Sequence, residues 1–292
     1  MTRDGLSYAV VTPVWNEEER LPVLAACIEA QSLLPTAWIV VDTGSDDSTS
    51  RVLDELSSRH SWIRTVRLGE VRAARGGPVV RAFAAGIREL GNDLPDVVVK
   101  LDADVTFDTT YFRQLLDGFE NEPRLGIASG LCYEESDGAW RPVYGTRSHV
   151  WGASRAYRRA CLVEVLPLEE RQGWDEIDAI KAQLNGWQVG TLFDVPFRHH
   201  RAEGRRDGGR RRWLDQGDTA HFMGYRFSYL LARALFKACR DPAALAMVEG
   251  YVRATLRRAP VLDDRQAREH LRHNQRLRML PIRLREALGK SR

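Results

Sequence analysis

The sequence predicts an α/β protein with a mostly parallel sheet that is flanked by helices. Short apolar runs of the kind that form buried strands alternate with segments whose apolar residues recur at helical spacing. The connections between them are short, as in sheets built from strand–helix–strand units. In addition, three of the predicted strands end in polar residues. Ligands of parallel sheets bind beyond these carboxyl ends, so the same pattern that predicts the fold also indicates a site.

The first hundred residues contain four predicted strands and three predicted helices. The strands are expected at residues 8–11, 38–41, 63–68 and 96–101. The helices between them are marked by apolar residues on one face, namely Leu21, Leu24, Ala25 and Ile28, then Val52, Leu53 and Leu56, then Val80, Phe83, Ala84 and Ile87. Ser and Asp side chains at residues 45–48 can cap the second helix.

An acidic pair follows the fourth predicted strand. Asp102 and Asp104 are separated only by Ala103. Because the chain turns at a strand end, both carboxylates can converge on one point, and Ala103 is small enough to allow a close approach. Paired hard oxygen ligands suit Mg²⁺ or Mn²⁺ shared with a diphosphate. Polar residues at 12–17 and 42–47 follow the first two strands, so three polar strand ends are expected to meet.

The second half of the chain is expected to continue the sheet. Apolar spacing predicts a helix at residues 112–119, and residues 126–144 are expected to form a strand pair or a loop on the acceptor side. A further helix begins near Asp175 and Glu176 and precedes a strand at residues 187–192. Acids at a helix N-terminus are favoured by the helix dipole, so capping is an alternative to a catalytic role for this pair.

Three successive motifs resemble the signatures of glycosyltransferase family 2. They lie at residues 10–18, 40–49 and 102–104, which read VVTPVWNEE, VVDTGSDDST and DAD. The resemblance extends over residues 8–195. It implies the GT-A fold, a nucleotide-diphospho-sugar donor and a divalent metal cofactor, Mn²⁺ or Mg²⁺.

The resemblance also implies a donor site. The residues expected to bind the nucleotide sugar are Thr12, Pro13, Glu17, Asp42, Arg75, Asp102, Ala103 and Asp104. Within this set, Asp42 would hold the base or the ribose. Arg75 or Arg72 would add a contact from the loop before the third helix, with an ordinary surface charge as the alternative. Residues 151–153 and 157–159 resemble the segment beneath the donor sugar, with core packing as the alternative.

Residues 173–178 resemble the acidic motif that contains the family's catalytic base. An inverting transfer needs one carboxylate to take the proton of the acceptor hydroxyl group. The family order is usually Glu-Asp, whereas this chain has Asp175-Glu176, so both acids are candidates. Alignment to the second acid favours Glu176. Asp178 is expected to orient the helix or the acceptor.

Two adjacent histidines, His199 and His200, follow the last predicted strand. Imidazole tolerates Mn²⁺, so either ring can complete the ligand set of Asp102 and Asp104. A hydrogen-bonding pair at the surface is the alternative for both histidines.

The chain is expected to form a catalytic domain at residues 1–213 and a C-terminal helical extension at residues 214–292. The catalytic domain would comprise a nucleotide-binding half, residues 1–107, and an acceptor half, residues 108–213. The latter ends in a loop with six arginines, whose forked guanidinium groups suit a diphosphate. An apolar stripe in the extension packs on its own domain or lies on anionic lipid. Its residues are Met223, Phe227, Leu230, Leu231 and Ala234, flanked by Arg226, Arg233 and Lys237.

Composition argues against several classes of protein. The formal net charge is only +3, so no nucleic-acid partner is expected. The 4 cysteines are scattered, which suits a reducing cytosol. No apolar run approaches about 18 residues, the length at which a transmembrane helix is indicated. A cytoplasmic protein is therefore expected. The apolar stripe leaves peripheral contact with a membrane open, with core packing or a dimer contact as the alternatives.

The sequence thus predicts an inverting, metal-dependent glycosyltransferase. It would move a sugar from a nucleotide-diphospho-sugar to a hydroxyl acceptor such as a lipid-linked or cell-envelope glycan. Two alternatives stay open. A nucleotidyltransferase normally opens with a glycine-rich, lysine-bearing loop, which is absent after Val11. A sugar-nucleotide-binding protein would bind the donor without turnover.

Overall fold

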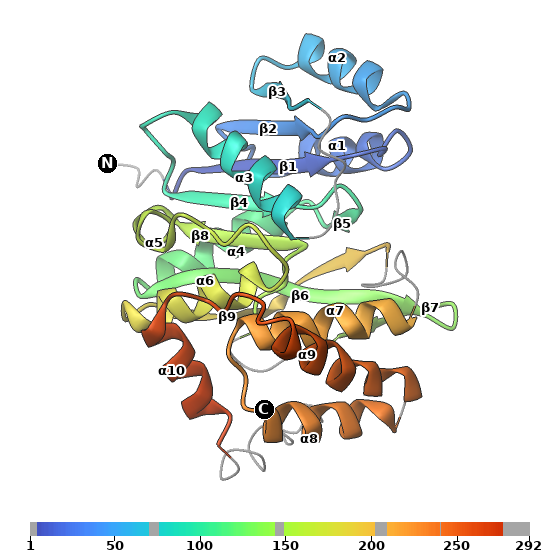
Figure 1. Cartoon of the computed structure of the whole chain (residues 1–292). Helices are drawn as coiled ribbons and strands as arrows, with labels where there is room; N and C mark the ends of the chain where they lie inside the picture. Colours follow the sequence, from blue (N-terminus) through green and yellow to red (C-terminus); the bar gives the residue numbers. More distant parts are fainter. Residues whose placement is uncertain (1–4, 70–75, 144–148, 202–208, 240, 277–292) are drawn as a thin grey trace. The chain divides into compact units, whose positions relative to one another are not determined.

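The computed structural model describes residues 5–69, 76–143, 149–201, 209–239 and 241–276 (Figure 1). The chain forms two compact units, Met1–His200 and Arg201–Arg292. The boundary expected from the sequence was residue 213, whereas residues 209–213 open a helix of the second unit. All the residues expected from the sequence to form the site lie in the first unit.

The first unit is built on a mixed, mostly parallel sheet of nine strands within the described residues. The strands are β1 (Tyr8–Val14), β2 (Ala37–Asp42), β3 (Ile63–Arg67), β4 (Val97–Leu101), β5 (Val105–Phe107), β6 (Leu125–Ser136), β7 (Ala139–Pro142), β8 (Ser154–Arg158) and β9 (Gln188–His199). Their order is β3-β2-β1-β4-β8-β6-β9-β5, and β7 pairs with β6. The first four are parallel, whereas β8 is antiparallel to β4 and β6. The predicted α/β fold with a mostly parallel sheet is confirmed.

Helices cover both faces of this sheet (Figure 1). One face packs α1 (Leu21–Glu29), α2 (Thr49–Arg59) and α4 (Tyr111–Asn121). The other packs α3 (Gly77–Leu90), α5 (Arg159–Val165) and α6 (Trp174–Leu184). Strand residues alternate between the two cores: Val10 and Val40 belong to the first, Val11 and Val41 to the second. Such runs appear continuously apolar because both faces of the strand are buried.

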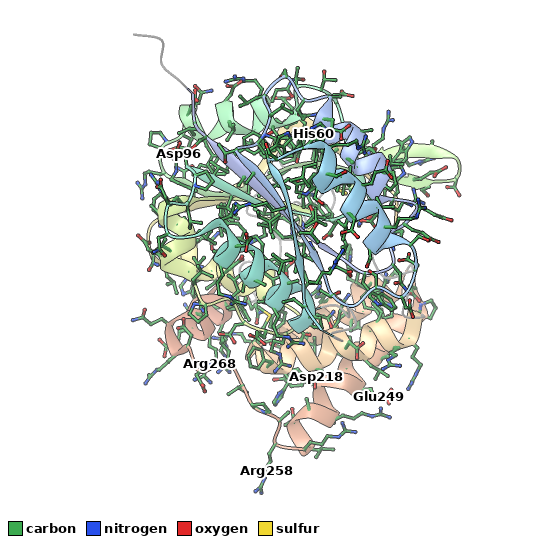
Figure 2. All side chains as sticks on the ribbon, turned by 90° about the horizontal axis from the view of Figure 1, so that it is seen from above. His60, Asp96, Asp218, Glu249, Arg258 and Arg268 are labelled. Atoms are coloured by element: carbon green, nitrogen blue, oxygen red, sulfur yellow. The ribbon has the colours of Figure 1, made fainter. Side chains whose placement is uncertain are left out.

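Close packing fixes α3 on β1. A methyl group at Gly86 of α3 would lie only 2.3 Å from Cγ1 of Val11. Just before β1 and β4 begin, the Asp96 carboxylate accepts hydrogen bonds from the Ser7 backbone N–H at 2.9 Å and from the Ser7 hydroxyl at 2.7 Å. Asp96 is labelled in Figure 2. The Ser7 backbone hydrogen bond is the main reason why the pKa of Asp96 is lowered, and it ties the starts of β1 and β4 together.

Three points about the expected elements matter for the site. Residues 125–142 form the strand pair β6 and β7, which is one of the two alternatives expected for residues 126–144. The predicted strand at residues 187–192 continues to His199, because its second half pairs with β6 and β5. The loop arginines Arg72 and Arg75 lie outside the described residues, as do residues 202–208 of the basic loop.

The second unit is helical. Its elements are α7 (Gly209–Phe222), α8 (Phe227–Ala238), the short 3₁₀ helix η1 (Pro242–Leu245), α9 (Ala246–Leu256) and α10 (Arg265–Asn274). Helices α7 and α9 pack backbone to backbone, since a methyl group at Gly217 would lie 2.0 Å from the Met247 carbonyl oxygen. Arg210 and Arg253 both pair with Glu249, which Figure 2 labels.

The apolar stripe expected in this unit is split. Met223 lies between α7 and α8, so the five residues do not form one continuous helical face. Leu230 and Ala234 are buried, whereas Phe227, Leu231 and Leu235 are exposed on α8. None of the helices in the described part of the chain is long and apolar enough to cross a membrane.

Candidate functional site

The loops after β1 and β2 are joined by side-chain hydrogen bonds. Asp46 lies beside Asn16, with the Asn16 side-chain amide donating to its carboxylate at 2.5 Å, and Thr49 accepts from the backbone N–H of Glu17 at 2.8 Å. Asn16 adopts a positive φ of 54°, a backbone conformation that Asn tolerates better than most residues. The two loops therefore form one continuous rim at the carboxyl ends of β1 and β2.

Two of the residues expected to bind the donor, at and beneath this rim, already make hydrogen bonds within the protein. Asp42 is buried at the end of β2 and accepts hydrogen bonds from the Ser45 backbone N–H at 2.9 Å and the Ser45 hydroxyl at 2.8 Å. Thr12 is fully buried, and its hydroxyl accepts from Nε1 of Trp38 at 2.9 Å. The Thr12 side chain thus lies in the core beneath the rim rather than in a pocket wall. Pro13 and Glu17 lie on either side of the turn that follows.

The carboxylates of Asp102 and Asp104 converge, as predicted, between β4 and β5. Ala103 between them is buried. Lys100, which is nearly buried at the end of β4, pairs with Asp102 and also donates to the Gly152 carbonyl oxygen at 2.8 Å. Burial raises the pKa of Asp102, and the neighbouring Lys100 only partly opposes this effect. The Lys100 ammonium thus sits within the site, a role that the sequence analysis did not assign.

The structure distinguishes the two histidines. Nε2 of His199 lies 3.4 Å from Oδ1 of Asp104, and Asp102, Asp104 and His199 each offer a ligand atom within 4.8 Å of the others. His200 turns away: its Nε2 is 2.8 Å from the Thr106 hydroxyl, and its ring contacts Trp140 edge-on. His200 lies one residue beyond the end of β9, and its ring is directed at Thr106 and Trp140, so His199 is the histidine whose ring joins the carboxylates.

His199 is held by acidic neighbours on both sides of its ring. Its Nδ1 lies 3.6 Å from Oε1 of Glu134 on β6. Burial alone would lower the pKa of His199, but hydrogen bonds to Asp104, Cys132 and Glu134 outweigh burial and raise it to about 12. The raised pKa favours the protonated ring, whose charge opposes that of these carboxylates.

The acidic motif forms the first turn of α6, which begins after Gly173 in the left-handed conformation, with φ of 88°. Asp175 is half-buried, and its Oδ2 would lie 3.6 Å from a side chain placed at Gly152. Glu176, the acid favoured by the sequence analysis, is exposed on the same turn. Asp175 therefore faces Gly152, the residue whose carbonyl holds Lys100.

A buried ionic network supports this turn. Arg155 of β8 pairs with Asp178 of α6, and both side chains are essentially inaccessible to solvent. The Tyr157 hydroxyl donates to the same carboxylate at 2.5 Å. Arg155 also donates to the backbone carbonyl oxygens of Asp175 at 2.7 Å and Val150 at 2.9 Å. Asp178 thus orients the helix, one of the two roles expected for it, and it does so from the core.

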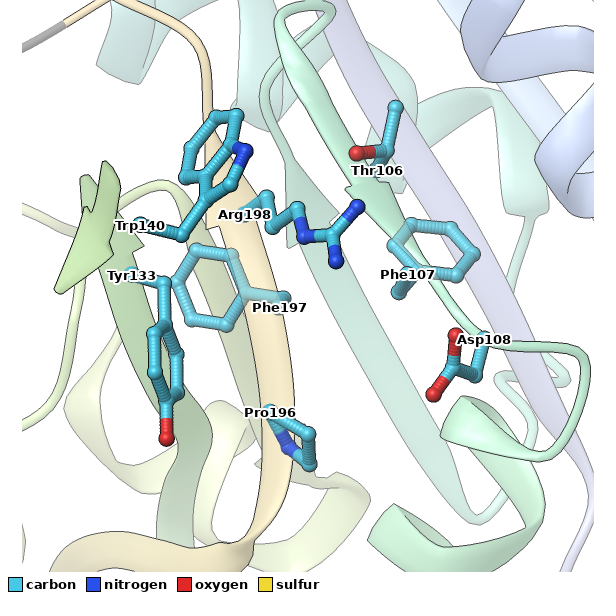
Figure 3. A pocket seen from close by; sticks show the side chains of 8 residues that line it. All are labelled: Thr106, Phe107, Asp108, Tyr133, Trp140, Pro196, Phe197 and Arg198. Carbon is cyan, nitrogen blue, oxygen red and sulfur yellow. The ribbon is translucent and has the colours of Figure 1, made fainter. Parts of the chain in front are cut away.

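A separate pocket is lined by side chains from β5, β6, β7 and β9 (Figure 3). Its volume is about 340 Å³, and its walls are Thr106, Phe107, Asp108, Tyr133, Trp140, Pro196, Phe197 and Arg198. The Arg198 guanidinium stacks over Trp140 at 5.4 Å. Tyr133 and Arg198 are paired neighbours in the sheet, one residue before Glu134 and His199. Because side chains alternate along strands, this pair faces away from the His199 ring.

Lys100, Glu134 and Arg155 are the site residues that the sequence analysis missed. Two of them lie beside polar residues and gave no clear signal: Arg155 follows Ser154, and Glu134 precedes Glu135 and Ser136. Lys100 did have a signal, because it follows three valines and is the one charged residue in an otherwise apolar strand. A charge in such a strand must find a partner inside the protein, because burial of an unpaired charge is very unfavourable.

Comparison with known proteins places these residues in a family context. A family model described as glycosyl transferase family 2 matches residues 9–231. The chain is 26% identical over 239 residues to a beta-monoglucosyldiacylglycerol synthase of Synechocystis, covering 71% of this chain and 50% of that protein. It is 28% identical over 182 residues to an undecaprenyl-phosphate 4-deoxy-4-formamido-L-arabinose transferase of Pseudomonas aeruginosa, covering 56% of this chain and 50% of that protein. The chain thus spans about half the length of these curated relatives.

Solved structures share the fold. A mannosyltransferase from Pyrobaculum calidifontis, in complex with GDP-Man and Mn²⁺, superposes with a TM-score of 0.60 at 16% identity, covering 97% of this chain and 84% of that chain. GalNAc-T7 with UDP, GalNAc and Mn²⁺ gives a TM-score of 0.55 at 14% identity, covering 69% of this chain and 45% of that chain. The GT-A-type fold predicted from the sequence is confirmed by these likenesses.

Proposed function

Because this chain belongs to glycosyl transferase family 2 and is a glycosyltransferase, we propose that it transfers a sugar, with inversion, from a nucleotide-diphospho-sugar to an acceptor hydroxyl group. The observation that carries the proposal is the convergence of Asp102, Asp104 and His199 at the carboxyl end of the sheet. This edge is where ligands bind in open α/β sheets. The structural neighbours named above bind nucleotides or nucleotide sugars together with Mn²⁺.

The ligand atoms of Asp102, Asp104 and His199 fit a hard or borderline divalent cation. Two carboxylates and one imidazole leave coordination positions open, as Mn²⁺ or Mg²⁺ requires when it is shared with phosphate oxygens. Asp102, Asp104 and His199 would hold the ion. His200 is less suited than His199, because its Nε2 is engaged by the Thr106 hydroxyl. When bound, the ion neutralises the negative charge that builds up on the leaving diphosphate.

The loop rim would hold the nucleoside part of the donor. Asp42 is fixed in place by Ser45, so its carboxylate is held at the end of β2, next to the end of β1 that contains Pro13. Glu17 follows in the loop after β1. The methyl group of Ala103 is too small to keep the diphosphate away from the carboxylates. Lys100 supplies a fixed positive charge at the same point, since its ammonium is anchored by the Gly152 carbonyl oxygen.

For the catalytic base, the geometry supports Asp175 over Glu176. Asp175 faces Gly152, whose carbonyl oxygen holds the Lys100 ammonium, whereas Glu176 is exposed on the same turn. In an inverting displacement, Asp175 would accept the proton of the acceptor hydroxyl as its oxygen attacks the anomeric carbon. Arg155 fixes the backbone of Asp175, so the carboxylate is held before the acceptor arrives.

The acceptor is proposed to be lipid-linked. The two curated relatives described above are named for diacylglycerol and undecaprenyl phosphate products or acceptors. The second unit, a helical extension to the catalytic part, offers a surface that suits an anionic membrane. Helix α8 exposes Phe227, Leu231 and Leu235, and its sequence contains Arg233 and Lys237 but no acidic residue. Basic residues close to an anionic lipid surface contribute about 1 kcal/mol each.

The direct test is a panel of nucleotide sugars incubated with the protein and Mn²⁺, with and without lipid-linked acceptors. Release of the nucleoside diphosphate together with a glycosylated product supports the proposal. Release of pyrophosphate would identify a nucleotidyltransferase. Saturable binding of a nucleotide sugar without release of any product would identify a binding protein instead. Each alternative thus gives a different measured outcome.

A further inference from the structure

The ring of His199 lies between two groups of potential metal ligands. Nε2 faces Asp104 at 3.4 Å, on the side of the proposed catalytic metal. Nδ1 faces Glu134 at 3.6 Å, and Cys132, Glu134 and His199 each offer a ligand atom within 4.8 Å of the others. We propose that Cys132, Glu134 and His199 form a second, inhibitory metal site that selects Zn²⁺ or a similarly soft cation.

Strand pairing builds this second site. Cys132 and Glu134 are two residues apart on β6, so their side chains share one face of the sheet. Glu134 is paired in register with His199 on β9. The three ligands therefore come from two hydrogen-bonded strands rather than from a loop, and only side-chain rotations are needed to close them around an ion. Ligand atoms around a tetrahedral zinc ion lie about 3.3–3.6 Å apart, close to the 3.6 Å between Nδ1 and Oε1.

The ligand types decide which cation binds. A thiolate together with imidazole and carboxylate suits Zn²⁺, whereas Mg²⁺ and Mn²⁺ prefer the all-oxygen pair of Asp102 and Asp104 with a nitrogen. Cys132 is fully buried, while the side chains of Glu134 and His199 are 21% and 12% exposed. An ion would therefore enter from the side of Glu134 and His199 and keep one position for water. On binding, two protons leave to solvent: the Cys132 thiol loses its proton as the sulfur–metal bond forms, and the protonated His199 ring loses the proton on Nδ1 as the nitrogen–metal bond forms.

The two sites exclude each other through the shared ring. A neutral imidazole has one lone pair, so it can bind a metal through Nδ1 or through Nε2 but not through both. With Zn²⁺ on Nδ1, the ring proton sits on Nε2 and points at Asp104, where it cannot serve as a ligand for the catalytic ion. Zinc should therefore inhibit by withdrawing His199, a consequence that rests on the proposed role of His199 in transfer.

The binding test uses Co²⁺ as a spectroscopic substitute for zinc, in a full-length Cys27→Ser/Cys239→Ser background that removes the two accessible thiols. We expect a near-ultraviolet band from charge transfer between Cys132 sulfur and cobalt, and its disappearance when Zn²⁺ is added. Cys132→Ala should abolish the band. Asp102→Asn/Asp104→Asn should retain it, and so should Glu135→Gln, whose side chain is exposed on the neighbouring position of β6.

The absence of a thiolate band in the background protein would overturn the proposal. Glu134 would then serve only to orient the His199 ring. A band that persists in Cys132→Ala, or that is lost in Asp102→Asn/Asp104→Asn, would overturn it too. In the transfer assay with Mn²⁺, Cys132→Ala should raise the zinc concentration for half-inhibition at least tenfold relative to the background, in line with the 10–100-fold effects of altered metal surroundings. If the protein turns over no nucleotide sugar, the proposed function is wrong. The cobalt spectrum still shows whether Cys132, Glu134 and His199 bind a metal.

Discussion

The guanidinium group of Arg155 donates a hydrogen bond of 2.7 Å to the backbone carbonyl oxygen of Asp175. Arg155 is buried on β8, and it also holds Val150 and pairs with Asp178. A single side chain thus joins a central strand, the segment before Gly152 and the first turn of α6. The position of the proposed catalytic base therefore depends on a cation in the core.

Removing this cation should separate its structural role from its positioning role. Arg155→Met leaves the Asp178 carboxylate buried without its partner and should lower the free energy of unfolding by about 3–5 kcal/mol. Adding Asp178→Leu should recover most of that stability, because a well-packed apolar pair often replaces a buried ion pair without loss. Transfer by the double variant should stay low, since the first turn of α6 is no longer anchored. Urea denaturation and kcat measure the two effects, and an unchanged unfolding curve for Arg155→Met would contradict the network.

Loss of a carboxylate from the metal set should impair transfer without unfolding the protein. Asp104→Ala is expected to lose more than about 2 kcal/mol of transition-state stabilisation, the range seen when electrostatic stabilisation is removed at a reacting centre. Asp108→Ala is a matched control, because Asp108 is an exposed carboxylate four residues further along. Comparison of kcat/KM for the two variants measures the difference. Full activity of the unmodified protein in excess chelator would show that no metal is used.

The choice between the two acids of α6 can be made with amide substitutions. Asp175→Asn keeps the shape of the side chain but cannot accept the proton, so kcat should fall by about 10²-fold or more. Glu176→Gln should leave kcat nearly unchanged, because Glu176 is exposed on the same turn. Donor affinity and melting temperature are measured in parallel. The reverse ranking of kcat would restore Glu176 as the base, and a lower melting temperature with normal kcat would reduce both acids to helix caps.

Asp96 should make the fold sensitive to acid. Its pKa is lowered from 3.8, mainly by the backbone N–H of Ser7, so the ionised form stabilises the folded state. This contribution is present above pH 3.8 and is lost as the pH falls through the lower pKa of the folded state. Asp96→Asn should therefore cost stability near neutral pH and much less in acid. Urea denaturation at several pH values tests this, with Asp137→Asn in the exposed turn between β6 and β7 as the control. An equal cost at all pH values would rule out the linkage.

The exposed face of α8 should bind anionic vesicles weakly and reversibly. Apolar side chains and flanking cations act together at an interface, and salt screens the electrostatic part. Leu235→Ser should reduce flotation with phosphatidylserine vesicles at low salt, whereas Val163→Ser, at an equally exposed valine of α5, should not. Equal flotation with neutral lipid in high salt, or none at all, would contradict a membrane role for this helix.

The sequence predicted the sheet well because its strands are buried on both faces. Runs such as Val97 to Val99 leave little ambiguity, and the polar residues that follow mark the carboxyl edge. The convergence of Asp102 and Asp104 followed from the same logic. The choice between His199 and His200 did not, because it depends on the strand continuing to residue 199 and on its pairing with β5 and β6, which sets the direction of the His199 side chain. No local pattern contains that register.

The remaining differences come from long-range contacts. Thr12 seemed suited to a ligand pocket, but Trp38 on the neighbouring strand takes up its hydroxyl. Asp175 and Glu176 have the same local sequence environment, and only the position of Gly152, from another segment, separates them. Lys100 and Arg155 find their partners 52 and 23 residues away, respectively, in Gly152 and Asp178. Local sequence patterns therefore identify the candidate catalytic and metal-binding residues more easily than the residues that position them.

Lys100 gives the site a consequence for how it takes up an ion. Asp102 has the Lys100 ammonium as its neighbour, and Asp104 has the His199 ring. A divalent ion that enters between these carboxylates would bring two positive charges, and His199 would give up one proton to bind it. Because the Gly152 carbonyl oxygen anchors Lys100, its ammonium would stay beside Asp102 and weaken the binding of the ion. The site would then hold its ion loosely enough to release it with the diphosphate, while the sheet stays where it is.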